Sequence, residues 1–157
     1  MASKAKELII RLNALGKTVA AAESCTAGLA ADLVARIPGA SRVLWGSFVS
    51  YTPESKVRML GVREETLKQF GAVSRETACA MADGALERSG AHCAFSVTGL
   101  AGPGTDDSGQ PAGTVWIATA VQNEKTIAAV YKFSGSRNSV RRKAAARALD
   151  DMMKRLL

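Results

Sequence analysis

Three polar side chains of different chemistry stand in a row near the N-terminus, at Glu23, Ser24 and Cys25. They follow a run of small and β-branched residues at 18–22 and precede an apolar helical pattern. This order predicts a buried strand that ends where a helix begins, and in open α/β sheets such junctions bind ligands. A carboxylate, a hydroxyl and a thiol at that point indicate an active site, whereas the alternative is that Ser24 and Thr26 only cap the helix.

The first candidate for chemistry is a serine nucleophile, Ser24, with Lys56 as its general base. The chain has one histidine, His92, which falls at the start of an expected strand, so a Ser-His-Asp triad is poorly supported. A lysine can take the place of histidine if burial and nearby positive charge lower its pKa from about 10.4 towards neutrality. Pro53 suits the first turn of a helix capped by Thr52, and this directs Lys56, about one turn later, towards the same crevice.

Cys25 is the rival nucleophile, because with Glu23 and Lys56 it makes a Glu-Lys-Cys set of the kind that amidases of other folds use. A helix N-terminus would help to form its thiolate. A buried cysteine more often packs as a small apolar side chain, however. We favour Ser24, because Cys25 points to the opposite face if the strand continues through both residues.

A second candidate region is the glycine-rich loop at 98–113, which follows an expected strand. Its backbone can approach a ligand closely and direct N–H groups towards it. The loop matches neither a P-loop nor a dinucleotide-binding fingerprint, because no Lys-Ser or Lys-Thr pair follows the glycines and a strand comes next. It is either an anion cradle or a mobile linker.

The elements that must position these residues follow from hydrophobic periodicity and from glycine and proline breaks. Strands are expected at 18–22, 43–51 and 91–97 and, as an antiparallel hairpin, at 114–121 and 126–133. Helices are expected at 3–15, 26–37, 53–61, 64–70, 74–87 and 136–157. The pattern predicts a single α/β domain at 1–157 with a mixed sheet.

Composition is that of an ordinary soluble globular domain. The 157 residues are 47% hydrophobic, 22% charged and 5% aromatic, enough for one core without disulfides or metals. The three cysteines show no paired spacing, so neither a disulfide framework nor a zinc site is expected. The N-terminus resembles an amphipathic helix rather than a signal peptide, and no apolar run reaches membrane-spanning length. We expect a cytoplasmic protein that needs no metal, no cofactor and no membrane.

The formal net charge of +7 raises the question of a nucleic-acid partner. Much of the excess positive charge lies in the expected last helix. This helix contains two acidic residues, Asp150 and Asp151, and seven cations: Arg137, Arg141, Arg142, Lys143, Arg147, Lys154 and Arg155. These cations do not share one helix face, and no aromatic or recognition residues lie between them. A solvated helix with one or two functional arginines is therefore favoured over nucleic-acid binding.

Several ordered motifs together closely resemble the CinA C-terminal domain family. They are A-E-S-C-T-A-G at 22–28, S-Y-x-x-x-x-K at 50–56, G-A-V-S at 71–74, T-G-L-A-G-P-G at 98–104, P-A-G-T-V-W-I-A at 111–118 and R-x-x-x-R at 137–141. Members are nicotinamide-nucleotide amidohydrolases, found alone or as the C-terminal half of the competence/damage-inducible protein CinA. The match covers nearly the whole chain, which looks like the stand-alone form.

The resemblance implies a three-layer α/β/α domain, a homo-oligomer, and hydrolysis of nicotinamide mononucleotide to nicotinate mononucleotide and ammonia. Ser24 matches the proposed nucleophile of the family and Lys56 its base, with Tyr51 beside them. The remaining substrate-binding candidates are Glu23, Cys25, Thr26, Thr98, Gly99, Gly102, Gly104, Arg137 and Arg141. The alternative is a pyridine-nucleotide-binding or competence-related regulatory module without turnover.

Within this interpretation the substrate phosphate meets either Arg141 or the glycine-rich loop, because arginine forks and exposed amides both suit phosphate oxygens. Glu23 would orient either Lys56 or a ribose hydroxyl. Amides at the start of the following helix would stabilise the oxyanion. Two positions depart from the family pattern and bear on substrate fit: Pro53 stands where asparagine is common, and Thr105-Asp106 where glycines often run on.

Overall fold

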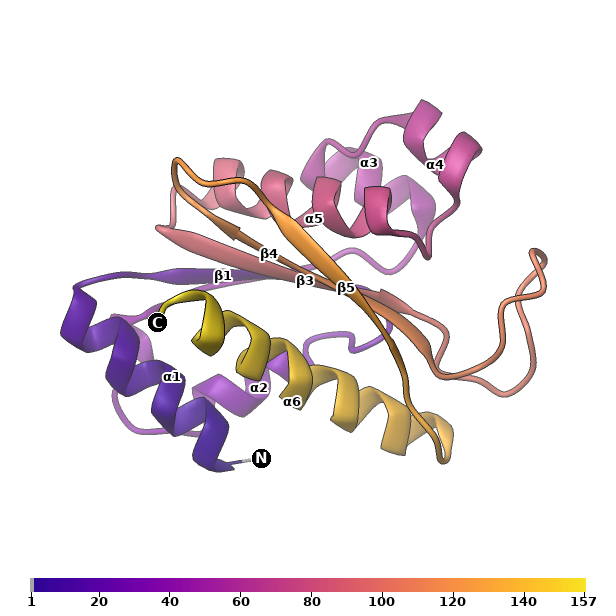
Figure 1. Cartoon of the computed structure of the whole chain (residues 1–157). Coiled ribbons are helices and arrows are strands. Elements are labelled where there is room, and N and C mark those ends of the chain that lie inside the picture. The colour runs from indigo at the N-terminus through magenta and orange to yellow at the C-terminus, as the bar shows by residue number, and fades with distance from the viewer. Residues whose placement is uncertain (1) are drawn as a thin grey trace.

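The computed structural model describes residues 2–157, which form one α/β domain (Figure 1). The strands are β1 (Val19–Glu23), β2 (Leu44–Val49), β3 (Cys93–Gly99), β4 (Thr114–Val121) and β5 (Ile127–Lys132). The α-helices are α1 (Ala2–Leu15), α2 (Leu29–Ala35), α3 (Pro53–Leu60), α4 (Glu64–Phe70), α5 (Arg75–Ser89) and α6 (Arg137–Arg155), and a 3-10 helix, η1, spans Ala40–Arg42.

The five strands form one mixed sheet in the order β2-β1-β3-β4-β5. β1 lies between β2 and β3 and is parallel to both, whereas β4 and β5 add as an antiparallel hairpin. Glu23 at the end of β1 pairs with Val49 of β2 and with Val97 of β3. The three parallel strands therefore end at the same edge of the sheet, and the segments that follow them meet there.

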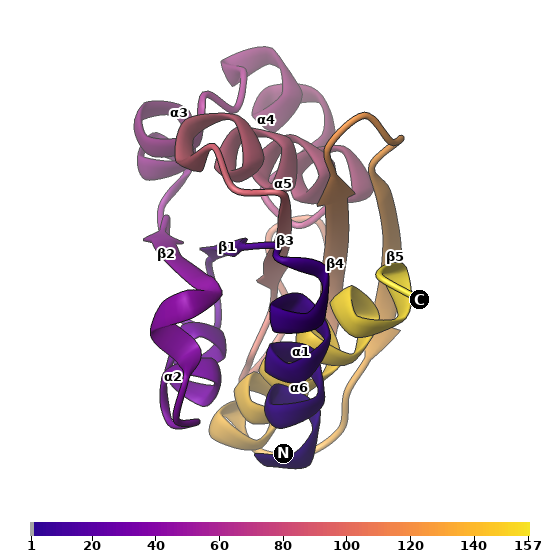
Figure 2. The same ribbon diagram turned by 90° about the vertical axis from the view of Figure 1, so that its left-hand side faces the viewer.

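Helices cover both faces of the sheet, with α1, α2 and α6 on one side and α3, α4 and α5 on the other (Figures 1 and 2). The alternation of side chains along a strand serves both layers. Val19 and Ala21 of β1 join the core under α1 and α6, while Ala20 and Ala22 join the core under α5. Together with the mixed sheet, this arrangement confirms the predicted three-layer α/β/α fold.

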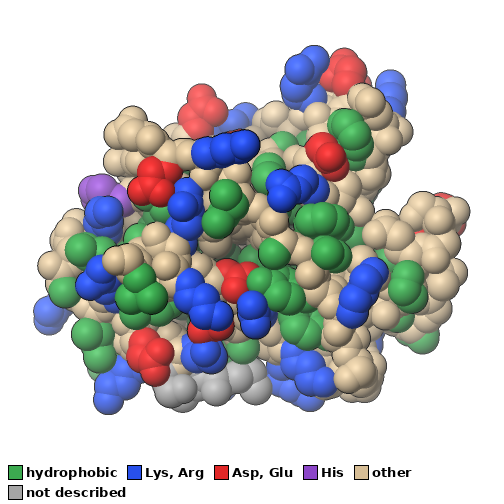
Figure 3. Space-filling model, in the orientation of Figure 1, with side chains coloured by type: hydrophobic (Ala, Val, Ile, Leu, Met, Phe, Trp, Pro, Cys, Tyr) green, Lys and Arg blue, Asp and Glu red, His purple; other side chains and the backbone are tan. Residues whose placement is uncertain are grey.

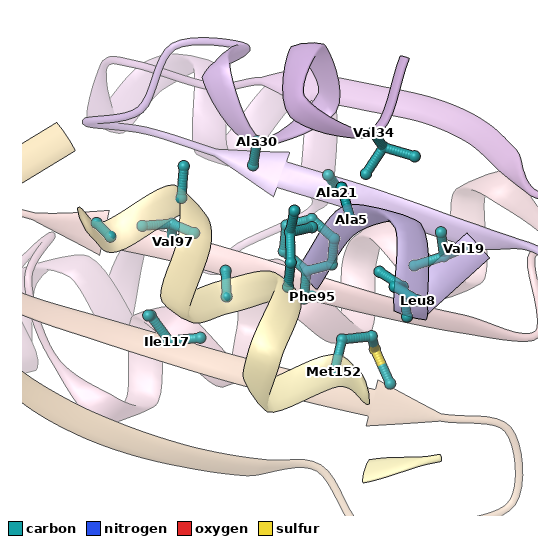
Figure 4. Close-up of a cluster of buried hydrophobic side chains, with 14 of the residues drawn as sticks. Ala5, Leu8, Val19, Ala21, Ala30, Val34, Phe95, Val97, Ile117 and Met152 are labelled. Carbon is teal, nitrogen blue, oxygen red and sulfur yellow. The ribbon is translucent and has the colours of Figure 1, made fainter. Parts of the chain in front are cut away.

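The larger core lies between the sheet and the α1–α2–α6 layer. Leu8, Phe95, Ile117 and Met152 meet there from α1, β3, β4 and α6 (Figure 4), and each is at most 1% exposed. The first and last helices also contact each other through polar groups, since Lys4 Nζ lies 2.5 Å from Asp150 Oδ1. Helices from the two ends of the sequence therefore pack against each other in this layer.

The opposite layer depends on small side chains. α5 presents Ala78, Ala82, Gly84 and Ala85, all buried, to the sheet and to α3. A Cβ at Gly84 would lie 2.0 Å from the carbonyl oxygen of Leu60, a distance that no real contact allows. The end of α3 therefore packs directly on the backbone of α5.

We expect Gly84→Ala to destabilise the fold, although alanine is the better helix former by about 1 kcal/mol. The added methyl group must displace the Leu60 carbonyl, and overpacking of this kind costs about 1–3 kcal/mol. Urea denaturation measures the free energy of unfolding, with Glu87→Ala on the exposed side of α5 as the control. Equal stability of Gly84→Ala and wild type would show that α3 is free to move away from α5.

Charges on the face seen in Figure 3 are dispersed. Figure 3 shows Lys and Arg side chains spread over one face with acidic side chains among them. Several of the C-terminal cations form ion pairs, namely Arg147 with Asp151, Lys154 with Asp150 and Arg155 with Glu124. Of the helices within 2–157, none combines the length and hydropathy needed to cross a membrane.

Candidate active site

A serine and a lysine meet at the sheet edge where β1, β2 and β3 end. Ser24 directly follows β1, and Lys56 lies in the first turn of α3, whose start is fixed by a capping box between Thr52 and Ser55 with Pro53 at the first helical positions. Lys56 Nζ lies 2.8 Å from Ser24 Oγ. Ser24 is 8% exposed and Lys56 1%. A buried amine is thus in hydrogen-bond contact with a hydroxyl that retains an opening to solvent.

The surroundings of Lys56 hold no carboxylate partner. Its Nζ also donates to the carbonyl oxygens of Ser50, at 2.8 Å, and Tyr51, at 3.3 Å. Within residues 2–157, no ion pair includes Lys56. Burial lowers the pKa of Lys56 from 10.5 to about 8, because removal from water disfavours the charged ammonium. A substantial fraction of this amine is neutral near pH 8.

The turn between β1 and α2 differs from the prediction. The expected helix start at Thr26–Gly28 is wrong, because residues 24–28 form a turn in which Ala27 and Gly28 have φ values of 47° and 95°, and α2 begins at Leu29. Neither Ser24 nor Thr26 caps α2. The carboxylate of Glu23 does so, since it accepts hydrogen bonds from the N–H groups of Ala30 and Ala31 at 2.8 and 3.2 Å.

The carboxylate of Glu23 is therefore engaged in hydrogen bonds with the start of α2. The same carboxylate also accepts a hydrogen bond from Ser47 Oγ at 2.8 Å, and the residue is fully buried. It does not line the pocket beside Ser24. The expectation that Glu23 orients Lys56 or a ribose hydroxyl thus has no support in the geometry, and its contacts tie β1, β2 and α2 together.

Cys25 lies beside Ser24 on the same pocket, contrary to the expectation of opposite faces, because β1 ends before both residues. Burial raises the pKa of the Cys25 thiol to about 11, outweighing the cations Lys56 and Arg141, which lower it. Among the described residues, no hydrogen bond joins Cys25 Sγ to Lys56. The hydrogen bond from Lys56 is made to Ser24 rather than to Cys25.

The pocket at this edge has a volume of about 270 Å³. Of the residues predicted for the site, it brings together nine: Ser24, Cys25, Tyr51, Lys56, Thr98, Gly99, Gly102, Gly104 and Arg137. Thr105, one of the departures from the family pattern, also lines it, whereas Pro53 does not. Lys56 and Arg137 are the charged side chains among these lining residues, so the pocket is cationic.

Arg137 closes one side of the pocket at the start of α6. Its guanidinium donates to the carbonyl oxygen of Gly102 at 2.6 Å and to the hydroxyl of Tyr51 at 2.9 Å. The glycine-rich loop is thereby held to the segment after β2. The peptide N–H groups of Ala101, Gly102 and Gly104 make no hydrogen bond within residues 2–157, which leaves them available to an anion.

Three predicted site residues lie outside the pocket lining: Glu23, Thr26 and Arg141. Thr26 is fully buried, and its hydroxyl has no partner among the described residues. The Arg141 guanidinium donates to the carbonyl oxygens of Cys25, at 2.9 Å, and Thr26, at 3.1 Å. The expected contact of Arg141 with a substrate phosphate is thus not supported by its placement.

Sequence reasoning assigned no role to several residues that complete the site. The carbonyl of Ser50 holds Lys56. Ala72 and Val73, between α4 and α5, form a pocket wall, and the Ala72 carbonyl accepts a hydrogen bond from Thr98 Oγ1 at 2.7 Å. The motif G-A-V-S at 71–74 was the available signal, but backbone contacts and small apolar walls carry no reactive side chain that a sequence pattern could reveal.

The remaining candidates for chemistry lie elsewhere. His92 Nδ1 accepts a hydrogen bond from the Thr18 N–H at 3.1 Å, at the opposite edge of the sheet from Ser24. Within the described part of the chain, no three His, Cys, Asp or Glu side chains lie close enough together to hold a metal ion. The chemistry that the site offers is that of a hydroxyl and a weakly basic amine.

Comparison with known proteins places this arrangement in a family. The model of the CinA C-terminal domain matches residues 1–156. The chain belongs to the CinA C-terminal domain family. A nicotinamide-nucleotide amidohydrolase, PncC, from Escherichia coli is 44% identical over 146 residues, which cover 93% of this chain and 88% of that protein.

Other relatives of this CinA C-terminal domain are longer. A CinA-like protein from Endomicrobium trichonymphae is 45% identical over 141 residues, 90% of this chain but 33% of that protein, so the chain spans about a third of such relatives. Among solved structures, the competence/damage inducible protein CihA from Agrobacterium tumefaciens superposes with a TM-score of 0.93 at 42% identity, covering 99% of this chain and 94% of that one.

Proposed function

We propose that this domain is an amidohydrolase that converts nicotinamide mononucleotide to nicotinate mononucleotide and ammonia, with Ser24 as nucleophile and Lys56 as general base. The observation that carries the proposal is the 2.8 Å contact between Ser24 Oγ and a buried lysine that has no carboxylate partner among the described residues. A relative named nicotinamide-nucleotide amidohydrolase, 44% identical, supports the substrate.

The hydrogen-bond geometry of Lys56 suits a base. A neutral amine has two N–H donors and one lone pair, and the carbonyls of Ser50 and Tyr51 take up the two donors. The lone pair is left for the Ser24 hydroxyl. When Lys56 accepts the serine proton it becomes an ammonium with three donors, and the same three oxygens accept them. Proton transfer therefore needs little rearrangement.

The reaction then proceeds by acyl transfer. Ser24 Oγ attacks the carboxamide carbon, and Lys56 returns its proton to the departing nitrogen, which leaves as ammonia. A water molecule, deprotonated by Lys56, hydrolyses the acyl-serine and releases the carboxylate. The oxyanion formed in each step needs donors, and the N–H groups of Cys25 and Thr26 donate to no other residue within 2–157. The helix start expected for this role is occupied by Glu23.

The substrate phosphate is assigned to Arg137 and the glycine-rich loop. Arg137 is a pocket-lining cation, and the unpartnered amides of Ala101, Gly102 and Gly104 lie in the same wall. A guanidinium and backbone amides together suit phosphate oxygens. Tyr51 lines the pocket, and its carbonyl accepts a hydrogen bond from Lys56. We keep the expectations of a homo-oligomer and a cytoplasmic location as predictions.

The pH dependence of turnover follows from the pKa of Lys56. Because the base must be neutral, and because burial lowers its pKa to about 8, kcat/KM should rise tenfold per pH unit below about 8 and level off above it. Steady-state kinetics of ammonia release between pH 6 and pH 10 measure this profile. A rate that is flat from pH 6 to pH 8 would remove Lys56 as the base.

The deciding experiment is an ammonia assay over nicotinamide mononucleotide, nicotinamide riboside, nicotinamide and unrelated small amides. Release from the mononucleotide, well above that from the others, is the expected result. Tight mononucleotide binding with no ammonia would instead favour the regulatory pyridine-nucleotide-binding module. Steep salt-dependent affinity for DNA would be required for a nucleic-acid role, and the ion pairs made by Arg147, Lys154 and Arg155 speak against it.

A further inference from the structure

Arg141 lies one helical turn after Arg137 on α6 but does not line the pocket, because its guanidinium binds the turn that carries Ser24. All three of its guanidinium nitrogens are engaged. Nε donates to the carbonyl of Cys25 at 2.9 Å, one Nη donates to the carbonyl of Thr26 at 3.1 Å, and the other donates to Asn138 Oδ1 at 3.1 Å. The side chain thus binds two consecutive peptide groups of the turn.

The position of a carbonyl fixes the N–H of the next residue, because a trans peptide is planar and its C=O and N–H point in opposite directions. The Cys25 carbonyl points at Arg141, so the N–H of Thr26 points away from it. The Ser24 carbonyl accepts a hydrogen bond from Ala27, which fixes the N–H of Cys25 in the same way. Neither of these two N–H groups donates a hydrogen bond to another residue within 2–157.

The turn does not hold this shape by conformational preference alone. Ala27 adopts a φ of 47°, in the left-handed region that non-glycine residues rarely enter, and Gly28 follows at 95°. Such conformations persist where the surroundings over-determine them. Glu23 holds the start of α2 on one side of the turn, and Arg141 holds its carbonyls on the other.

We propose that Arg141 is a positioning residue, which acts through the carbonyls of Cys25 and Thr26 to hold the turn after Ser24 in the shape that presents its backbone N–H groups to the oxyanion formed on Ser24 attack. The inference rests on the proposed function, because it needs Ser24 as the nucleophile. It assigns to Arg141 a role in the rate of acyl transfer rather than in binding the substrate phosphate.

The positive charge of Arg141 also favours the oxyanion. A guanidinium bound to a carbonyl oxygen polarises the whole peptide and makes its N–H a stronger donor. The charge of Arg141 reaches the pocket side of the turn: although burial raises the pKa of the Cys25 thiol to about 11, Arg141 is one of the cations that lower it. Negative charge on an oxyanion beside Cys25 is stabilised by the same cation.

The test compares Arg141→Met and Arg141→Lys with Arg142→Met, an exposed cation on the same helix. Loss of one oxyanion donor costs about 10²–10³-fold in kcat, so we expect Arg141→Met to lower kcat about 10²-fold with KM little changed. The kcat of Arg141→Lys, which keeps the positive charge but loses the forked guanidinium, should lie between those of Arg141→Met and wild type. Arg142→Met should match wild type.

Two measurements separate positioning from phosphate binding. Calorimetric titration with nicotinate mononucleotide should give the same Kd for Arg141→Met and wild type, and added guanidinium ion at millimolar concentration should restore part of kcat. A Kd raised tenfold or more with kcat unchanged would overturn the inference. If Arg141→Met does not fold, as judged by its thermal transition, Arg141→Lys carries the same comparison.

A third measurement distinguishes failure of this inference from failure of the proposed function. Acylation of Ser24 by p-nitrophenyl acetate, followed as a mass increase, needs the oxyanion donors but not the nucleotide pocket. If wild type releases no ammonia from nicotinamide mononucleotide yet is acylated about 10²-fold faster than Arg141→Met, the substrate is wrong and the inference stands. Equal acylation rates of the two proteins, or no acylation of either, would refute the inference.

Discussion

Ser24→Ala should abolish ammonia release from nicotinamide mononucleotide, lowering kcat by at least about 10³-fold. The methyl group leaves Lys56 without a proton to accept and removes the atom that forms the acyl intermediate. Only one side-chain oxygen is lost from a position that is 8% exposed, so the fold and the pocket should remain. The measurement is a coupled ammonia assay together with calorimetric titration of nicotinate mononucleotide, whose Kd should be unchanged.

Cys25→Ala is the matched control, because the thiol lines the same pocket. Its high pKa, about 11 as a result of burial, keeps it protonated and poorly nucleophilic at neutral pH. We expect this variant to keep kcat within about tenfold of wild type, since a buried cysteine acts mainly through packing. Full turnover by Ser24→Ala with loss in Cys25→Ala would transfer the nucleophile to the thiol.

Lys56→Met should also lose at least about 10³-fold in kcat while changing how stability depends on pH. In wild type the unfolded state binds more protons than the folded state between pH 8 and 10.5, because the pKa of Lys56 is lowered from 10.5 to about 8 on folding. The free energy of unfolding of wild type should therefore rise by about 3 kcal/mol across this window through Lys56 alone. The variant lacks this contribution.

The measurement is urea denaturation of both proteins at pH 7.5 and at pH 10.5. The stability of Lys56→Met relative to wild type should fall by about 3 kcal/mol between the two, whatever the cost of leaving the Ser50 and Tyr51 carbonyls without a donor. Lys68→Met, at an exposed position, is the control and should run parallel to wild type. If the free energy of unfolding of Lys56→Met changed with pH as that of wild type does, burial would not lower the pKa of this lysine.

Sequence patterns were sufficient for the fold and for the central pair of the site. Period-2 and period-3.6 hydrophobicity place the five strands and six α-helices within a few residues of their observed bounds. Ser24 directly follows β1, and Lys56 lies in the helix that follows β2. Because β1 and β2 pair in parallel, the segments after them lie at the same edge of the sheet, so the contact between Ser24 and Lys56 was predictable. Pro53 and Thr52 then fix the start of α3 and hence the direction of Lys56.

The errors concern side chains whose partners are decided by tertiary structure. Glu23 reads as a reactive acid in sequence, yet it caps a helix that starts six residues later and binds Ser47 of the neighbouring strand. Arg141 reads as an anion ligand, yet two carbonyls of a distant turn take up its fork. A carboxylate accepts hydrogen bonds equally well as a helix cap or in a reactive site, and a guanidinium donates equally well to a phosphate or to a backbone carbonyl, so residue type alone does not distinguish these roles.

Because α6 is the last helix to be synthesised, its packing has a consequence for how the site is assembled. A growing polypeptide makes the strand-turn segment with Ser24 and the helix with Lys56 before it makes Arg137 and Arg141. The last helix packs on the first one, through contacts that include Lys4 and Asp150. If the proposed role of Arg141 holds, we expect a nascent chain that already contains Ser24 and Lys56 to gain acyl-transfer activity only once α6 has packed.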